Sequence, residues 1–198
     1  MKLLNLKALD KRAMYRLLTS AVVPRPIALV TTKSQDGSIN VAPFSYFNVV
    51  TTEPPRLHIV VGRDKKTNER KDTSRHILAT KRFVIQAVTE ANLVDANQSA
   101  KRLSPHQSEL DITGFTPITR KDFPVPYMKE SPVAFDCELD RTVVFETSEM
   151  FIGRVVGIRV DEACFTGGQF DIINTGFIGR LSGNSYATLG KVIDLERP

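Results

Sequence analysis

Three short apolar runs follow one another near the start of this chain without a helix between them. They cover residues 27–32, 38–47 and 57–61, and Asp36-Gly37 separates the first two. An Asp-Gly pair between β-branched runs is a strong signal for a tight hairpin turn. A doubly wound α/β fold needs a helix after nearly every strand, so these runs indicate an antiparallel sheet instead.

Later segments extend this pattern. Apolar residues alternate through residues 133–145, and a second run at 151–160 follows after a short polar break, which predicts a long antiparallel hairpin. Residues 83–88 form another run typical of a strand. Residues 104–131 are rich in Pro, Asp and Thr and show no clear period.

Helical spacing is limited to short stretches. It predicts helices at residues 10–18, with Asp10 as the N-cap, at 73–81 and at 90–102. A chain of 198 residues and 22.1 kDa is usually one domain. We therefore expect a single domain over residues 1–198, mainly β with peripheral helices, as a barrel or sandwich of about six strands.

The net charge of the chain is concentrated in one place. The whole chain carries +5, and residues 63–82 alone hold eight basic and three acidic side chains. A local excess suits one anionic group on a small ligand. A solvated charged loop without a ligand stays open as an alternative, as does a nucleic-acid-binding β-barrel. Against the latter, this segment has almost no interleaved aromatic residues on which bases could stack.

The composition argues against several other classes of protein. Cys137 and Cys164 belong to no CxxC motif and the three histidines are not clustered, so we expect no metal site and two buried, reduced thiols. The N-terminal segment is interrupted by charge every three or four residues. No apolar run approaches the ~20 residues that a membrane span needs. We therefore expect a cytoplasmic protein without a membrane segment.

Two segments carry the strongest indication of function. Residues 39–55 begin as a strand and continue as a loop of hydroxyl, amide and aromatic side chains, and residues 70–77 are a basic loop that ends at a helix start. The first offers a flat apolar surface with backbone amides for a planar ring. The second offers cations and N–H groups for a phosphate. A chain with both is suited to flavin mononucleotide (FMN).

Several short motifs resemble, in order and spacing, the flavin reductase-like family of FMN-binding split barrels, to which flavoredoxin-type proteins belong. These motifs are Pro24-Arg25-Pro26-Ile27-Ala28, the run from Asn40 to Asn48, Pro54-Pro55, Lys71-Asp72-Thr73, the strand from Phe151 to Val156, Arg180-Leu181 and Tyr186. The resemblance covers most of the chain. It implies a six-stranded antiparallel Greek-key split β-barrel, a homodimer, and non-covalent FMN in a cleft to which both subunits contribute.

The resemblance and the residue chemistry together suggest how the phosphate of FMN would be held. Lys71 would supply charge and Thr73 its hydroxyl, while Asp72 would cap the following helix. Ser45 is the matching hydroxyl on the strand side. The alternatives are that Lys71-Asp72-Thr73 is only a helix start and that Ser45 is only a loop serine.

The flavin ring would lie on the strand side. Asn40, Ala42, Pro43 and Phe44 offer close approach, and Pro43 marks an edge or bulge because it cannot donate to the sheet ladder. Tyr46 and Phe47 would stack on the ring or fill the core, and core packing is the preferred reading for Phe47. Arg25 would reach the N1–C2 edge of the ring or the phosphate, where its charge would stabilise the reduced flavin; the alternative is a surface arginine beside a helix end.

No catalytic triad, paired carboxylate or activated thiol stands out, so we name no catalytic residue. Hydride transfer between a nicotinamide and a flavin needs no protein acid or base. Since no GxGxxG motif is present, NADH or NADPH would bind in the same open cleft. The sequence thus predicts an NAD(P)H-dependent oxidoreductase that passes electrons to a small-molecule acceptor. A non-catalytic FMN-binding electron carrier is the alternative.

Overall fold

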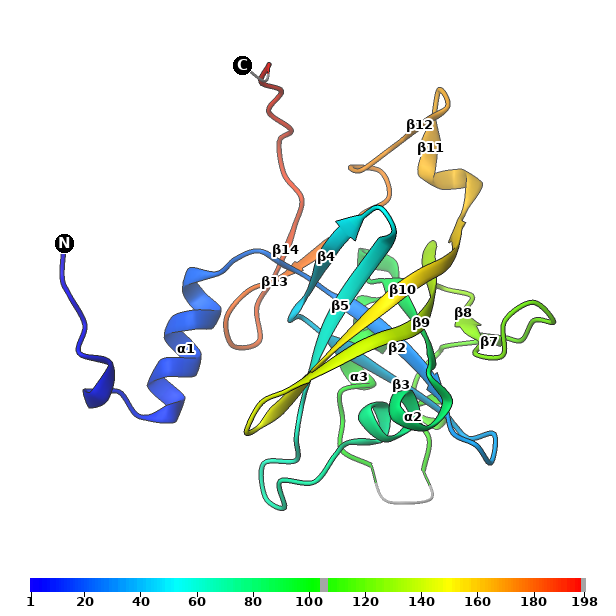
Figure 1. The fold of residues 1–198 in the computed structure, drawn as a ribbon. Helices are drawn as coiled ribbons and strands as arrows, with labels where there is room; N and C mark the ends of the chain where they lie inside the picture. Colours follow the sequence, from blue (N-terminus) through cyan, green and yellow to red (C-terminus); the bar gives the residue numbers. More distant parts are fainter. Residues whose placement is uncertain (104–106, 197–198) are drawn as a thin grey trace.

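The computed structural model describes residues 1–103 and 107–196, and its central feature is a strongly curved antiparallel sheet (Figure 1). Hydrogen-bonded neighbours follow the order β3-β2-β6-β9-β10-β5-β4. These strands are β2 (Ala28–Lys33), β3 (Ile39–Phe44), β4 (Phe47–Thr52), β5 (Pro55–Gly62), β6 (Arg82–Ala87), β9 (Val133–Val144) and β10 (Ser148–Val160). Every pairing between them is antiparallel, as the sequence predicted.

The two outermost strands of this order, β3 and β4, are consecutive in the chain and are separated only by Ser45 and Tyr46. They form one bent strand that pairs with β2 before the bend and with β5 after it, and the carbonyl of Tyr46 accepts the N–H of Val60 at 2.8 Å. The sheet therefore closes into a barrel. Counting the bent strand once gives the expected six strands. The continuous strand predicted at 38–47 was wrong in one respect, because the bend divides it.

The predicted long hairpin is confirmed as β9 and β10, although β10 begins at Ser148, earlier than expected. Its register shifts twice, and the first shift falls between Ile152 and Gly153. A Cβ atom on Gly153 would lie 2.6 Å from Cζ of Phe83 and 3.0 Å from Cβ of Cys137. Glycine is therefore required at this close approach of β10 to Phe83 and Cys137 of the barrel core.

The barrel core is built by alternation along the strands. Leu57, Ile59 and Val61 of β5 point inward and pack with the fully buried Phe83 and Phe151. A second cluster lies on the other face of β2 and β3 and consists of Ile27, Leu29, Val41, Val88, Ala96, Phe115, Met128 and Ile178. Both cysteines are free and buried, as predicted.

The helices lie outside the barrel. The first, α1 (Lys11–Ala21), begins after Asp10, whose carboxylate accepts the N–H of Ala13 at 2.6 Å and confirms the predicted N-cap. In Figure 1, α1 stands apart from the sheet beside the N-terminal segment, which contains η1 (Leu6–Ala8). The others are α2 (Asp72–Thr80) and α3 (Leu93–Gln98). The helix predicted at 90–102 is shorter than expected, and its start is a 3-10 turn, η2 (Glu90–Asn92).

The remaining elements are short. A small sheet joins β1 (Arg25–Pro26), β13 (Ile178–Arg180) and β14 (Tyr186–Thr188). In its described part, the segment predicted without clear period contains η3 (Glu109–Asp111), β7 (Pro117–Ile118) and β8 (Tyr127–Met128), and η4 (Glu162–Cys164), β11 (Phe165–Thr166) and β12 (Gln169–Phe170) follow β10. Within the described ranges, no helix is both long enough and apolar enough to cross a membrane.

Candidate functional site

The two segments that the sequence analysis assigned to one ligand lie against each other. Helix α2 packs beside β2 and β3. The side-chain amide of Asn40 in β3 donates to the hydroxyl of Thr73 in the first turn of α2 at 3.0 Å, and both side chains are buried. This contact joins the strand predicted to hold the ring to the helix start predicted to hold the phosphate.

Two residues that the sequence analysis did not single out complete this polar cluster. Thr32 Oγ1 accepts from Asn40 Nδ2 at 3.4 Å and lies 3.1 Å from Nδ1 of His76. The Thr32 hydroxyl can donate to Nδ1 of a neutral His76 ring or accept from it, depending on the tautomer. Burial is the main cause that lowers the pKa of His76 and so favours the neutral ring. Helical spacing could have identified His76, because it follows Thr73 by three residues and so lies on the same side of the helix.

We expect acid to weaken this cluster. The pKa of His76 lies below its ordinary value of 6.5 in the folded protein, so the folded state binds the proton less readily than the unfolded chain. Stability is therefore lost as the pH falls through a window that begins near 6.5. His76→Gln should make the fall of the urea midpoint between about pH 7 and pH 5 shallower.

The matched comparison for this prediction is His58→Gln. Burial also lowers the pKa of His58, so each variant should remove a share of the pH dependence, and the double variant should remove more than either. Equal slopes in the wild-type protein and His76→Gln would contradict the role of His76.

The bent strand carries the remaining ring candidates. Ala42, Pro43 and Phe44 end β3, Ser45 and Tyr46 form the bend, and Phe47 begins β4. Phe44 and Phe47 pack against the barrel core, which supports the core reading of Phe47. Tyr46 is exposed and Ser45 is half-buried. Pro43 lies in an outer strand of the sheet order, as expected for a residue that cannot donate to the ladder.

At the start of α2, the predicted role of Asp72 was wrong. The helix begins at Asp72, and Lys71 occupies the N-cap position without a side-chain capping bond. The carboxylate of Asp72 pairs instead with Arg75, one helical turn further on. The N-cap falls one residue earlier than predicted. The carboxylate of Asp72, in the first turn, still stabilises the helix through its interaction with the helix dipole.

Half of the basic residues between 63 and 82 are paired with carboxylates. Arg63 and Arg70 both contact Glu149, a fully buried side chain of β10, and Arg75 and Arg82 pair with carboxylates beside them. Among the residues that the structure describes, no ion pair joins a carboxylate to the other four, which are Lys65, Lys66, Lys71 and Lys81. Lys71 is therefore the unpaired cation at the start of α2.

The structure contradicts the alternative reading of Arg25 as a surface arginine. Arg25 is only 7% exposed, so it is not a surface residue. Its guanidinium donates to the carbonyl oxygens of Thr19, Val22 and Leu181 at 2.7–2.8 Å. The side chain thereby ties the end of α1 to the turn between β13 and β14. Its contact with a flavin ring or phosphate stays a prediction.

The donors gathered at the start of α2 fit a phosphate. The first turn of a helix presents N–H groups without intrahelical partners, and here it contains the buried Thr73 and Ser74. The Thr73 hydroxyl accepts from Asn40 and so keeps its own proton to donate. With the ammonium of Lys71, this set of N–H, hydroxyl and cation matches the chemistry of a phosphate site.

Comparison with known proteins agrees with this geometry. The chain matches the flavin reductase like domain over residues 19–171, a range that includes both segments meeting at Asn40 and Thr73. The uncharacterized protein YwrF of Bacillus subtilis (strain 168) is 39% identical over 198 residues, and the match covers 96% of each chain.

Two solved structures resemble the whole chain. Nitrilotriacetate monooxygenase component B from Bacillus cereus has a TM-score of 0.92 and 35% identity, with 98% of each chain covered. The 2-nitrobenzoate 2-nitroreductase NbaA from Pseudomonas fluorescens has a TM-score of 0.89 and 26% identity, covering 100% of this chain and 96% of that one. Together with the closed six-stranded barrel, these matches confirm the predicted fold and resemblance, and the chain belongs to the flavin reductase-like domain family.

Proposed function

We propose that this protein binds FMN non-covalently where β3, the bend at Ser45 and Tyr46 and the start of α2 meet, and that it is an NAD(P)H-dependent oxidoreductase. The observation that supports this most is the buried contact between Asn40 and Thr73, because it unites the ring and phosphate segments. Family membership supports a flavin. The phosphate-type donors at α2 favour a flavin with a terminal phosphate.

Each part of the site has a distinct task in this proposal. Lys71, Thr73 and Ser45 bind the phosphate, Asn40 positions the Thr73 hydroxyl, and the ring lies along the segment from Ala42 to Tyr46. Bound FMN would supply a ring that takes up a hydride and passes electrons to a small acceptor. The small uncharged side chains of Ala42, Pro43 and Ser45 in this segment leave room beside the ring for a second planar molecule.

The experiment that tests this function starts from the purified, FMN-loaded protein under anaerobic conditions. We expect NADPH or NADH to bleach the flavin absorbance within seconds to minutes in a stopped-flow or diode-array measurement. Dithionite serves as the control that the bound flavin is reducible. If dithionite bleaches it and neither nucleotide does, the protein is an electron carrier and the reductase proposal fails.

We also propose a homodimer with the flavin at or near the interface. Val49 and Val50 of β4 are exposed, and so are Val156 and Ile158 of β10. Exposed apolar side chains on neighbouring parts of a sheet are candidates for an interaction surface, and β4 continues directly from the bend that carries the ring candidates. Light scattering at micromolar concentration tests this, since a 22.1 kDa species with flavin bound would contradict the dimer.

A further inference from the structure

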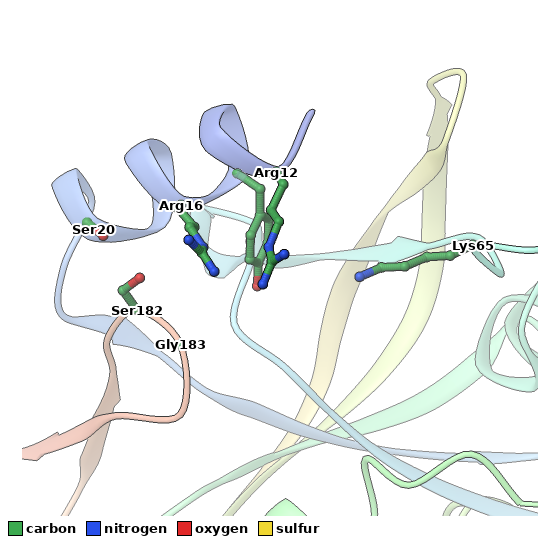
Figure 2. A pocket seen from close by; sticks show the side chains of 7 residues that line it. Arg12, Arg16, Ser20, Lys65, Ser182 and Gly183 are labelled. Atoms are coloured by element: carbon green, nitrogen blue, oxygen red, sulfur yellow. The ribbon is translucent and has the colours of Figure 1, made fainter. Parts of the chain in front are cut away.

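A basic groove lies between α1, the loop after β5 and the turn between β13 and β14. It encloses about 470 Å³. Arg12, Tyr15, Arg16 and Ser20 of α1 line it on one side, and Lys65 and Ser182 on the others. Figure 2 shows Arg12 and Arg16 extending from α1 toward the groove and Lys65 reaching toward them from the opposite loop. We call this cavity the α1 groove, and the FMN site proposed above does not use it.

The positive charges of the α1 groove lack counter-charges. None of its lining residues is acidic. Over the described ranges, no ion pair joins Arg12, Arg16 or Lys65 to a carboxylate. Arg12 and Arg16 are four residues apart on one helix face, a spacing at which like charges destabilise the helix. An anion in the groove would relieve this repulsion.

The walls of the α1 groove are held by buried or stacked side chains. The guanidinium of Arg25 joins the end of α1 to the carbonyl of Leu181, next to Ser182. On the other side of the turn, Arg180 donates to the carbonyl of Gly183 and lies 4.5 Å above the ring of Tyr186. The end of α1 and the turn between β13 and β14 are therefore held together before any ligand arrives, which reduces the entropy lost on binding.

The α1 groove opens beside the segment proposed to hold the flavin ring. β1, which carries Arg25, contacts β4. Burial is the main cause that raises the pKa of the Tyr46 hydroxyl; Tyr15 adds to this effect, and the charge of Arg25 opposes it. Tyr15 and Arg25 are thus close enough to act electrostatically on Tyr46. Tyr15 lines the groove, so the groove and the bend are neighbours on this side of the barrel.

We propose that the α1 groove binds the phosphate groups of the nicotinamide nucleotide and selects NADPH over NADH, an inference that rests on the proposed reductase function. The FMN phosphate is assigned to the start of α2, so this is a second anion site. A dinucleotide carries two phosphate charges, and the 2′-phosphate of NADPH adds about two more. Arginine is the side chain that accommodates a 2′-phosphate in nucleotide sites. Lys65 Nζ lies 6.0 Å from the centroid of the Tyr15 ring, so the adenine would stack on the opposite face of Tyr15.

The test uses 2′,5′-ADP as the probe, titrated calorimetrically into the FMN-loaded protein. Arg12→Gln/Arg16→Gln should raise its Kd by about tenfold or more, because each change removes a charge-assisted hydrogen bond. The Kd of FMN should stay within about twofold. Lys121→Gln/Lys129→Gln removes the same charge in the segment around β7 and β8, away from α1 in Figure 1, and should leave 2′,5′-ADP binding unchanged. The double arginine variant should also lose the preference of kcat/KM for NADPH.

Several results would overturn the proposal. A loss of 2′,5′-ADP affinity no larger than in the lysine control would do so, and so would equal binding of 2′,5′-ADP and 5′-AMP by the wild-type protein. A parallel loss of FMN affinity would assign the groove to the flavin phosphate instead. A change in oligomeric state alone would make it a contact between copies. If neither nucleotide bleaches the flavin but 2′,5′-ADP binding depends on Arg12 and Arg16, the reductase proposal fails while the groove remains a nucleotide site.

Discussion

Replacing Asp136 by alanine should lower the free energy of unfolding by about 3–5 kcal/mol, because it removes the bidentate carboxylate of the buried Arg120 and leaves that guanidinium the more distant carboxylate of Asp122, at 3.9 Å. The guanidinium of Arg120 donates to both carboxylate oxygens of Asp136, at 2.8 and 2.6 Å. The two side chains are only 9% and 5% exposed. The same guanidinium lies over the rings of Phe123 and Tyr127 and donates to the carbonyl of Val125. Asp136 therefore anchors the segment around β7 and β8 to the barrel.

Asp140→Ala is the control for this prediction on the same strand. Its ion pairs with Arg56 and Arg141 lie at the surface, so the loss should stay within about 1 kcal/mol. Urea unfolding followed by circular dichroism measures both variants. The double variant Asp136→Leu/Arg120→Met should recover much of the loss, since two apolar side chains can replace a buried pair. Equal losses in Asp136→Ala and Asp140→Ala would show that the pair does not anchor the segment.

Asp136 also shows that the alternation of apolar residues in a sequence does not always identify which faces of a strand are buried. The pattern Val133, Phe135, Cys137 predicted one buried face for β9, yet Ala134 and Asp136 on the other face are buried as well. The reason is that Phe123 and Val125 pack on that face, in one cluster with Ala134 and with Val84 of the neighbouring strand. A segment without clear period gave no indication that it would fold over the sheet. The strands and the long hairpin, by contrast, were predictable because their turn and alternation signals are local.

The residues of the candidate site also divide into those that the sequence could predict and those that it could not. Asn40 and Thr73 were predictable as members of one site from motif chemistry, but their contact at 3.0 Å depends on how α2 packs against the barrel. Glu149 could have been found, because it shares the inward face of β10 with Phe151, and an acidic residue at such a position must have a partner. The α1 groove could not have been found, since Lys65 reaches Arg12 and Arg16 only through the fold.

Lys71, the unpaired cation at the start of α2, is the position where a substitution has the largest expected effect on ligand binding. Lys71→Glu should weaken FMN by about 30- to 100-fold, because a charge-assisted contact is replaced by repulsion of the phosphate. Riboflavin lacks the phosphate, so its Kd should change by no more than about twofold. Quenching of flavin fluorescence measures both affinities on the same protein. Because Lys71 is exposed, the difference should shrink as salt is added.

Lys66→Glu is the matched control, since it reverses the same charge in the same basic segment and Lys66 also has no carboxylate partner among the described residues. A loss of FMN affinity as large in Lys66→Glu would mean that the overall field of the segment, and not one contact, attracts the phosphate. Equal losses of FMN and riboflavin in Lys71→Glu would remove Lys71 from the phosphate site. A selective loss in Lys71→Glu alone would place the phosphate at the first turn of α2, where the buried Thr73 meets Asn40 and hence the strand that leads to the ring.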